Sequence, residues 1–96
     1  DIRNEDEVKE AIEKAVAHFG GIDIVINNAS AIWTKSTEDT PMKKYDLMNT
    51  VNARATFMTS KLAIPHLLVS AQKGRNPSVL NISPPLSMQT KWFAPH

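Results

Sequence analysis

The first strong pattern along the chain is a stripe of apolar residues at helical spacing. The stripe consists of Val8, Ala11, Ile12, Ala15, Val16 and Phe19. Glu, Lys and Asp fill most of the positions between them, as on the exposed face of an amphipathic helix. Asn4 and Glu7 can cap the first turn, and Gly20 and Gly21 can end the last one. The pattern predicts a helix over residues 5–19.

The next apolar stretch is almost continuous and rich in β-branched residues. Residues 22–26 read Ile-Asp-Ile-Val-Ile, which is typical of a parallel strand that is covered on both faces. Asn27 and Asn28 follow where this strand would end. In open α/β sheets ligands bind at the carboxyl ends of the strands, so this position is the first candidate for a binding site.

A long helical pattern follows a polar loop. Thr40 is expected to cap it and Pro41 to take its first helical position, so the predicted helix covers residues 41–70. Pro65 is expected to weaken the last two turns, because proline removes a backbone donor and crowds the preceding turn.

A second short strand is predicted over residues 78–83, and Pro84 with Pro85 ends it. The order helix, strand, helix, strand is typical of an α/β protein with parallel strands. Two strands alone leave sheet edges unpaired. We therefore expect residues 1–96 to form the central part of a Rossmann-type doubly wound parallel sheet, a partial domain interrupted at both ends.

Composition excludes several classes of function. The chain is 42% hydrophobic and 22% charged with a formal net charge of +1, which is typical of a soluble globular chain and gives no basic footprint for nucleic acid. No apolar run approaches the roughly 18–20 residues of a transmembrane helix. The absence of cysteine excludes disulfides and thiol catalysis within these residues. His18, His66 and His96 have no metal-ligand spacing, so we predict no metal site.

Three motifs occur in order along the chain. Asn-Asn-Ala-Ser at 27–30 follows the first strand, Asn52 lies within the long helix, and Leu-Asn-Ile-Ser at 80–83 forms the second strand. This combination resembles the short-chain dehydrogenase/reductase family, in which Asn-Asn-Ala-Gly follows the fourth strand and the fifth strand delivers a catalytic serine. The resemblance implies a Rossmann-type fold that binds NAD or NADP. It also implies hydride transfer between nicotinamide and a carbonyl or secondary alcohol.

The resemblance implies a cofactor contact at Asn28, Ala29 and Ser30, where small residues let a ribose approach the backbone. Ser30 replaces the usual glycine of the family, which limits positive φ. The resemblance also implies that the Asp1 carboxylate accepts a hydrogen bond from the adenine amino group and that Ile2 packs on the adenine ring. From the residues alone, the two asparagines could be turn residues, or their amides could bridge the ends of neighbouring strands.

Two residues are candidates for catalysis. Asn52 could simply point at solvent, but the resemblance implies a helix kink at this position and a proton-relay water on its backbone carbonyl. Ser83 could be structural, whereas the resemblance makes it the serine that polarises the substrate carbonyl. The second serine of many family members is Pro84 here, so Ser87 is the alternative for this role.

Other features of the family are not found in these 96 residues, namely the glycine-rich phosphate turn and the Tyr-x-x-x-Lys pair. We therefore expect the chain alone to be inactive. The resemblance implies a lipid-like or fatty acyl-derived substrate, a peroxisomal or mitochondrial location, and a subunit interface along the long helix. The alternatives are a non-catalytic Rossmann-type binding or regulatory module and a flavodoxin-like or receiver-type α/β protein, which Asn-Asn-Ala at 27–29 fits poorly.

Overall fold

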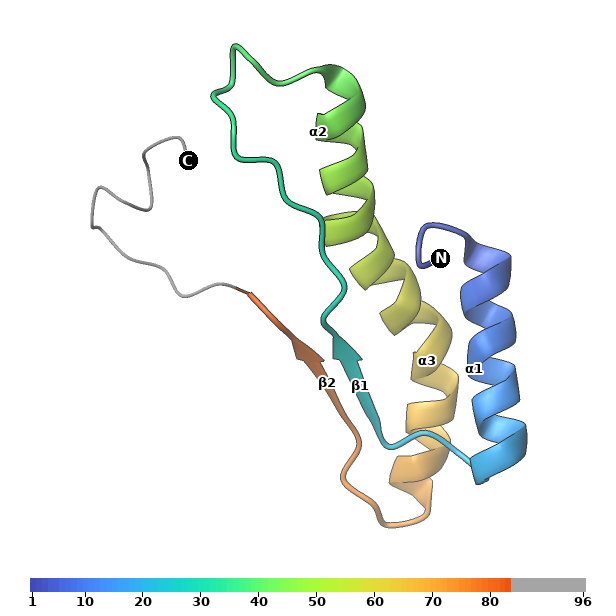
Figure 1. Ribbon diagram of the computed structural model, residues 1–96. Helices are drawn as coiled ribbons and strands as arrows, with labels where there is room; N and C mark the ends of the chain where they lie inside the picture. The colour runs from blue at the N-terminus through green and yellow to red at the C-terminus, as the bar shows by residue number, and fades with distance from the viewer. Residues whose placement is uncertain (84–96) are drawn as a thin grey trace.

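The computed structural model describes residues 1–83 and contains four elements of α/β structure joined in the predicted order. The long second helix is continuous in space but is assigned in three parts (Figure 1). The elements are α1 (Glu5–Phe19), β1 (Ile24–Asn27), α2 (Met42–Asn49), η1 (Thr50–Arg54), α3 (Ala55–Gln72) and β2 (Ser78–Asn81). The predicted order of helix, strand, helix and strand is confirmed.

The two strands form a parallel sheet in which Ile24 pairs with Ser78 and Asn27 with Asn81. One further hydrogen bond extends the ladder past the strand ends, from the Ile82 amide to the Asn27 carbonyl at 3.1 Å. Because the strands run the same way, their carboxyl ends lie side by side (Figure 1). Polar residues that follow either strand are thereby brought to one edge of the sheet.

Helices α1 and α3 lie on one face of this sheet (Figure 1). The central cluster consists of Val25, Ala63 and Leu67, with Ile12 and Ile22 packed against it. On the other face Ile24 and Ile26 are 57% and 58% exposed. Side chains alternate across a strand, so β1 turns one of its residues toward the helices and the next one away. Among residues 1–83, the predicted cover is therefore present on one face of β1 and absent from the other.

Asn4 and Gly20 cap α1 as predicted, but Glu7 does not form the reciprocal capping contact, because the Asn4 amide donates to the Asp1 carbonyl at 3.1 Å. The Asn4 side chain accepts a hydrogen bond from the Glu7 amide at 3.1 Å. At the other end Gly20 adopts a φ of 88°, and its amide donates to the Val16 carbonyl. A left-handed residue at this position is the common way for a helix to stop, and glycine adopts it without steric cost.

The start and the interior of the long helix differ from the prediction. Pro41 has an extended backbone and precedes the first helical residue, and the Thr40 hydroxyl donates to the Ser36 carbonyl at 2.7 Å instead of capping the helix. Pro65 lies inside α3 without interrupting it. Ala63 and Leu67, on either side of Pro65, are buried, and their packing offsets the lost backbone hydrogen bond.

Among residues 1–83, no helix combines the length and the hydropathy that crossing a lipid bilayer requires.

Candidate functional site

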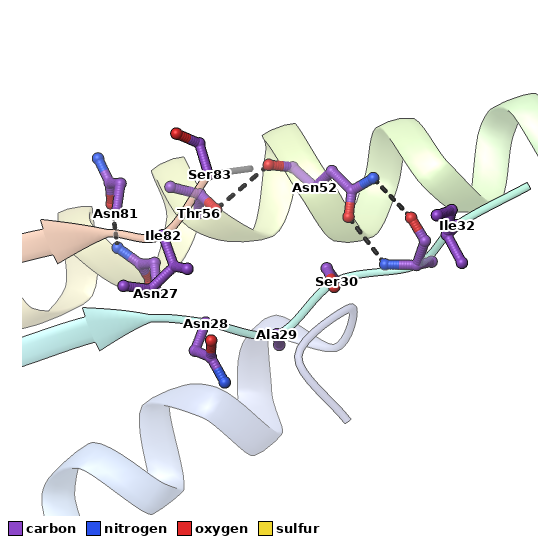
Figure 2. Close-up of a pocket in the computed structure, with 11 residues that line it drawn as sticks. Asn27, Asn28, Ala29, Ser30, Ile32, Asn52, Thr56, Asn81, Ile82 and Ser83 are labelled. Atoms are coloured by element: carbon purple, nitrogen blue, oxygen red, sulfur yellow. Dashed lines mark hydrogen bonds between the residues drawn. The ribbon is translucent and has the colours of Figure 1, made fainter. Parts of the chain in front are cut away.

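A cleft of about 660 Å³ opens at the carboxyl ends of both strands. Figure 2 shows its walls, which come from the segments after β1 and β2 and from the helical turn around Asn52. The lining residues are Asn27, Asn28, Ala29, Ser30, Ala31, Ile32, Asn52, Thr56, Asn81, Ile82 and Ser83. Five of the seven residues with a predicted cofactor or catalytic role thus meet in one cleft, namely Asn28, Ala29, Ser30, Asn52 and Ser83.

The turn that carries Asn52 is wider than an α-helical turn. Residues Thr50–Arg54 form a π-helical segment between α2 and α3, which is the kind of irregularity that often marks a functional site. The Asn52 side chain does not simply point at solvent. Its Oδ1 accepts from the Ala31 amide at 2.9 Å and its Nδ2 donates to the Ala31 carbonyl at 2.8 Å. The helix and the loop after β1 are therefore joined across the cleft wall (Figure 2).

The backbone carbonyl of Asn52 has a hydroxyl near it. Thr56, one turn further along the helix, donates its Oγ1 proton to this carbonyl at a long distance of 3.3 Å. A carbonyl oxygen has two lone pairs, so it can accept a second donor besides this hydroxyl.

The strand ends are joined by an amide pair. Asn27 Nδ2 donates to Asn81 Oδ1 at 2.8 Å and to Ser60 Oγ at 3.2 Å, and Ser60 Oγ donates to the Thr56 carbonyl at 2.8 Å. The prediction that asparagine amides bridge neighbouring strand ends is confirmed for Asn27. We did not predict roles for Thr56 and Ser60. Thr56 and Ser60 follow Asn52 at successive intervals of four residues, and this spacing is the sequence signal that could have revealed them.

The segment after β1 is exposed, so a ligand can approach its backbone. Asn28, Ala29 and Ser30 are all exposed, and the Asn28 side chain makes no hydrogen bond to any residue between 1 and 83. Within those same residues only glycines have positive φ, so Ser30 adopts an ordinary backbone conformation. The serine in place of glycine therefore introduces no backbone strain.

Ser83 lies on the cleft wall directly after β2 and is exposed. The alternative serine, Ser87, lies outside the described residues. The lining residues include amides, hydroxyls and small apolar groups, and none of those described carries an ionisable side chain. The described part of the cleft can orient and hydrogen-bond a ligand, but a proton donor or acceptor must come from elsewhere.

Asp1 and Ile2 do not line this cleft. The Asp1 carboxylate is held by Arg3, whose Nη2 lies 2.7 Å from Asp1 Oδ2 and whose backbone amide donates to Oδ1 at 2.8 Å. Asp1 and Ile2 thus lie outside the cleft that holds the other five predicted site residues.

A separate charged cluster anchors the opposite end of β1. Asp23 accepts the Ser70 hydroxyl at 2.6 Å and the Arg75 guanidinium at 2.7 Å. These two donors, the serine hydroxyl first, lower the pKa of the Asp23 carboxyl below its ordinary value of 3.8. This cluster is at the amino end of the strand and contributes no group to the cleft.

Comparison with known protein families identifies the chain. The family model described as short chain dehydrogenase matches residues 1–94. The chain belongs to the short chain dehydrogenase family. The Asn-Asn-Ala-Ser segment, Asn52 and Ser83 therefore occupy a cleft in a member of the family that they had indicated.

Individual relatives cover the whole chain. Hydroxysteroid dehydrogenase-like protein 2 of Danio rerio is 54% identical over 96 residues, and the chain spans 22% of that relative's length. The solved structure of a short chain dehydrogenase from Mycobacterium thermoresistibile is 48% identical in sequence and has a TM-score of 0.79. The aligned region covers 99% of this chain and 32% of that structure. These matches confirm the Rossmann-type α/β architecture.

One more distant structure was solved with a cofactor. The 3-ketoacyl-(acyl-carrier-protein) reductase of Brucella melitensis, in complex with NADH, has a TM-score of 0.80 at 28% identity. The aligned region covers 86% of this chain and 35% of the reductase. The chain thus spans about a third of the length of these two solved structures and 22% of the length of the hydroxysteroid dehydrogenase-like relative.

Proposed function

We propose that this chain forms one wall of the cofactor cleft in an NAD(P)-dependent oxidoreductase, which transfers hydride between nicotinamide and a carbonyl or secondary alcohol. The observation that carries the proposal is the cleft at the carboxyl ends of β1 and β2, lined by Asn28, Ala29, Ser30, Asn52 and Ser83. Ligands bind at this edge in open α/β sheets. The reductase from Brucella melitensis, a structural relative, binds NADH.

The residues present fit a nicotinamide cofactor. Ala29 and Ser30 are small and exposed, so a sugar ring can approach the backbone that carries them. The amides and hydroxyls of the cleft can bond ribose hydroxyls, and its apolar groups can pack against a sugar or nicotinamide ring. When bound, the cofactor supplies the hydride chemistry, while the protein binds, orients and protects it.

In the proposed site the cleft residues have different roles. Asn28, Ala29 and Ser30 contact the cofactor. Ser83 donates a hydrogen bond to the substrate carbonyl oxygen, where negative charge develops during reduction. The Asn52 carbonyl holds a water on the path of the transferred proton, a role that comes from the family resemblance.

Asp1 and Ile2 belong to the same proposal at the adenine end of the cofactor. The Asp1 carboxylate would accept a hydrogen bond from the adenine amino group, and Ile2 would pack on the adenine ring. Because Arg3 holds the Asp1 carboxylate, binding would require this contact to rearrange or to share its acceptor oxygens.

The substrate and setting are also proposed. A relative is named hydroxysteroid dehydrogenase-like and a structural relative is a 3-ketoacyl reductase, so we propose a lipid-like or fatty acyl-derived carbonyl compound. We further propose a peroxisomal or mitochondrial location, following the family resemblance. The exposed apolar residues Met42, Tyr45, Phe57 and Leu68 along the long helix are candidates for contacts between subunits.

The decisive experiment uses the full-length protein, meaning a chain that contains these residues and continues over the length of the curated relatives. NADH and NADPH binding is measured by fluorescence titration, followed by turnover with 3-ketoacyl and 3-ketosteroid substrates. Binding together with turnover supports the oxidoreductase. Binding without turnover on any carbonyl substrate favours the alternative, a non-catalytic Rossmann-type module. If neither nucleotide binds, the proposal is wrong.

A further inference from the structure

A directional chain of hydrogen bonds runs from helix α3 to the strand ends. It begins at the Thr56 carbonyl, which has no proton to give and can only accept. Ser60 Oγ lies 2.8 Å from this oxygen and donates its single proton to it. Toward Asn27, 3.2 Å away, Ser60 can then offer only a lone pair. The Asn27 atom that faces Ser60 must therefore be the amide nitrogen, not the oxygen.

The same constraint passes to the next residue. Asn27 Nδ2 also lies 2.8 Å from the side chain of Asn81, so Asn81 must turn its oxygen toward Asn27. Without Ser60, the two facing amides could both flip and keep their mutual hydrogen bond, since each carries one donor end and one acceptor end. Ser60 is thus the residue that decides between two otherwise equivalent orientations.

The outcome determines what the cleft presents to a ligand. Asn27 and Asn81 both line the cleft. Their mutual hydrogen bond uses the Asn27 nitrogen and the Asn81 oxygen, which leaves the Asn27 oxygen and the Asn81 amide group for other partners. Neither of these ends has a hydrogen-bond partner among the described residues. The Asn27 oxygen can accept a hydrogen bond from a ligand and the Asn81 amide group can donate one, and flipping the pair would exchange these two properties.

We infer that Ser60 is a positioning residue for the cofactor: it does not line the cleft, but through Asn27 it fixes the polarity of the amide pair that does. This inference rests on the proposed nicotinamide site. It adds three residues, Ser60, Asn27 and Asn81, that the motifs of the family resemblance did not assign to ligand binding.

The chain offers a matched control on the same helix. Ser70 also donates its hydroxyl to a side chain of β1, in this case Asp23 at 2.6 Å, but at the end of the strand remote from the cleft. Both serines anchor α3 to β1. Only Ser60 is linked to a residue that lines the cleft.

The test compares Ser60→Ala, Ser60→Thr and Ser70→Ala in the full-length protein, with NADH and NADPH as the probes. Ser60→Ala should weaken nucleotide binding by about 3–10-fold, the value of one neutral hydrogen bond, and change kcat by less than about twofold. Ser60→Thr keeps the hydroxyl and should restore affinity. Ser70→Ala should lower Tm and leave the affinity unchanged.

Other outcomes separate the two proposals. If the wild-type protein binds nucleotide and Ser60→Ala binds it equally well, the inference fails and the proposed function stands. Equal weakening by Ser60→Ala and Ser70→Ala also overturns the inference, because it reduces Ser60 to a general anchor. If the wild-type protein binds neither nucleotide, both fail. Should Ser60→Ala not fold, Ser60→Cys, with a poorer donor and acceptor, replaces it with the same expectation.

Discussion

The side chain of Asn52 forms two hydrogen bonds with the backbone of Ala31, a residue 21 positions earlier in the chain. The two bonds satisfy both the amide and the carbonyl of Ala31, as a neighbouring strand would. The loop that follows Asn27–Ser30 is therefore attached to the π-helical turn, and both segments line the cleft.

Replacing Asn52 by alanine should release this loop. With two hydrogen bonds lost at an exposed site, we expect the free energy of unfolding of the full-length protein to fall by about 1–2 kcal/mol. Nucleotide affinity should fall as well, because the loop forms part of the cleft wall. Denaturant unfolding and NADH titration measure the two effects.

Asn52→Asp is the control for this prediction. Aspartate keeps the acceptor for the Ala31 amide but turns an oxygen toward the Ala31 carbonyl, so it should recover at most part of the lost stability. Full stability and affinity in both variants would show that the Asn52 side chain does not hold the loop.

Replacing Ser83 by alanine in the full-length protein should reduce kcat by about 10²-fold or more if its hydroxyl helps to polarise the substrate carbonyl. The nucleotide Kd should change little, because the lost hydrogen bond forms with the substrate. Steady-state kinetics with a 3-ketoacyl substrate measures the effect. Ser87→Ala is the matched control, and a large loss there with none at Ser83 would transfer the role to Ser87.

Residues 1–96 expressed alone should show no NAD(P)H-dependent turnover. Within residues 1–83, the cleft has no ionisable lining residue, and the only tyrosine, Tyr45, is followed four positions later by Asn49 rather than lysine. A proton donor is needed to complete carbonyl reduction. The assay is nucleotide oxidation at 340 nm, with the full-length protein as positive control. Measurable turnover by the isolated chain would contradict our assignment of roles.

Asp23→Asn should lower stability at neutral pH and matter less in acid. The folded-state pKa of Asp23 is depressed by the Ser70 hydroxyl and then by Arg75. A depressed carboxyl pKa stabilises the folded state above the ordinary value of 3.8, and this contribution is lost as pH falls through the folded pKa.

The difference in Tm between wild type and Asp23→Asn should therefore be constant above about pH 5 and shrink as pH falls below about 4. Arg75→Gln removes the cation and keeps the serine hydrogen bond, so it should produce a smaller difference of the same sign. A difference that does not depend on pH would mean that Asp23 acts through shape alone.

How far the sequence predicts this structure depends on whether the cause is local. The bounds of α1 follow from its apolar stripe, its Asn4 cap and Gly20, all within one short segment. The position of the cleft follows from Asn27 and Asn28 after a strand, since parallel strands end at one edge. In contrast, the Asn52–Ala31 contact depends on how the loop packs, and no periodicity encodes it.

The errors have the same origin. Thr40 has a hydroxyl that could accept from a helix amide, but its side chain is oriented toward the loop, where it donates to the Ser36 carbonyl. Pro65 disfavours a helix by itself, yet the buried residues around it keep α3 continuous. In both positions a contact outside the local pattern outweighs an intrinsic preference.

Ser30→Gly restores the residue typical of the family motif and should nevertheless destabilise the protein slightly. Ser30 has no positive φ to relieve, and glycine gains conformational freedom in the unfolded chain, which costs about 0.4–1 kcal/mol. Gly20→Ala is the contrasting variant. Gly20 has a φ of 88° at the end of α1, where a side chain costs about 1–2 kcal/mol. Denaturant unfolding should therefore rank Gly20→Ala as the more damaging change. A Ser30→Gly protein that is more stable than the wild type would show instead that residue 30 is strained in the folded state.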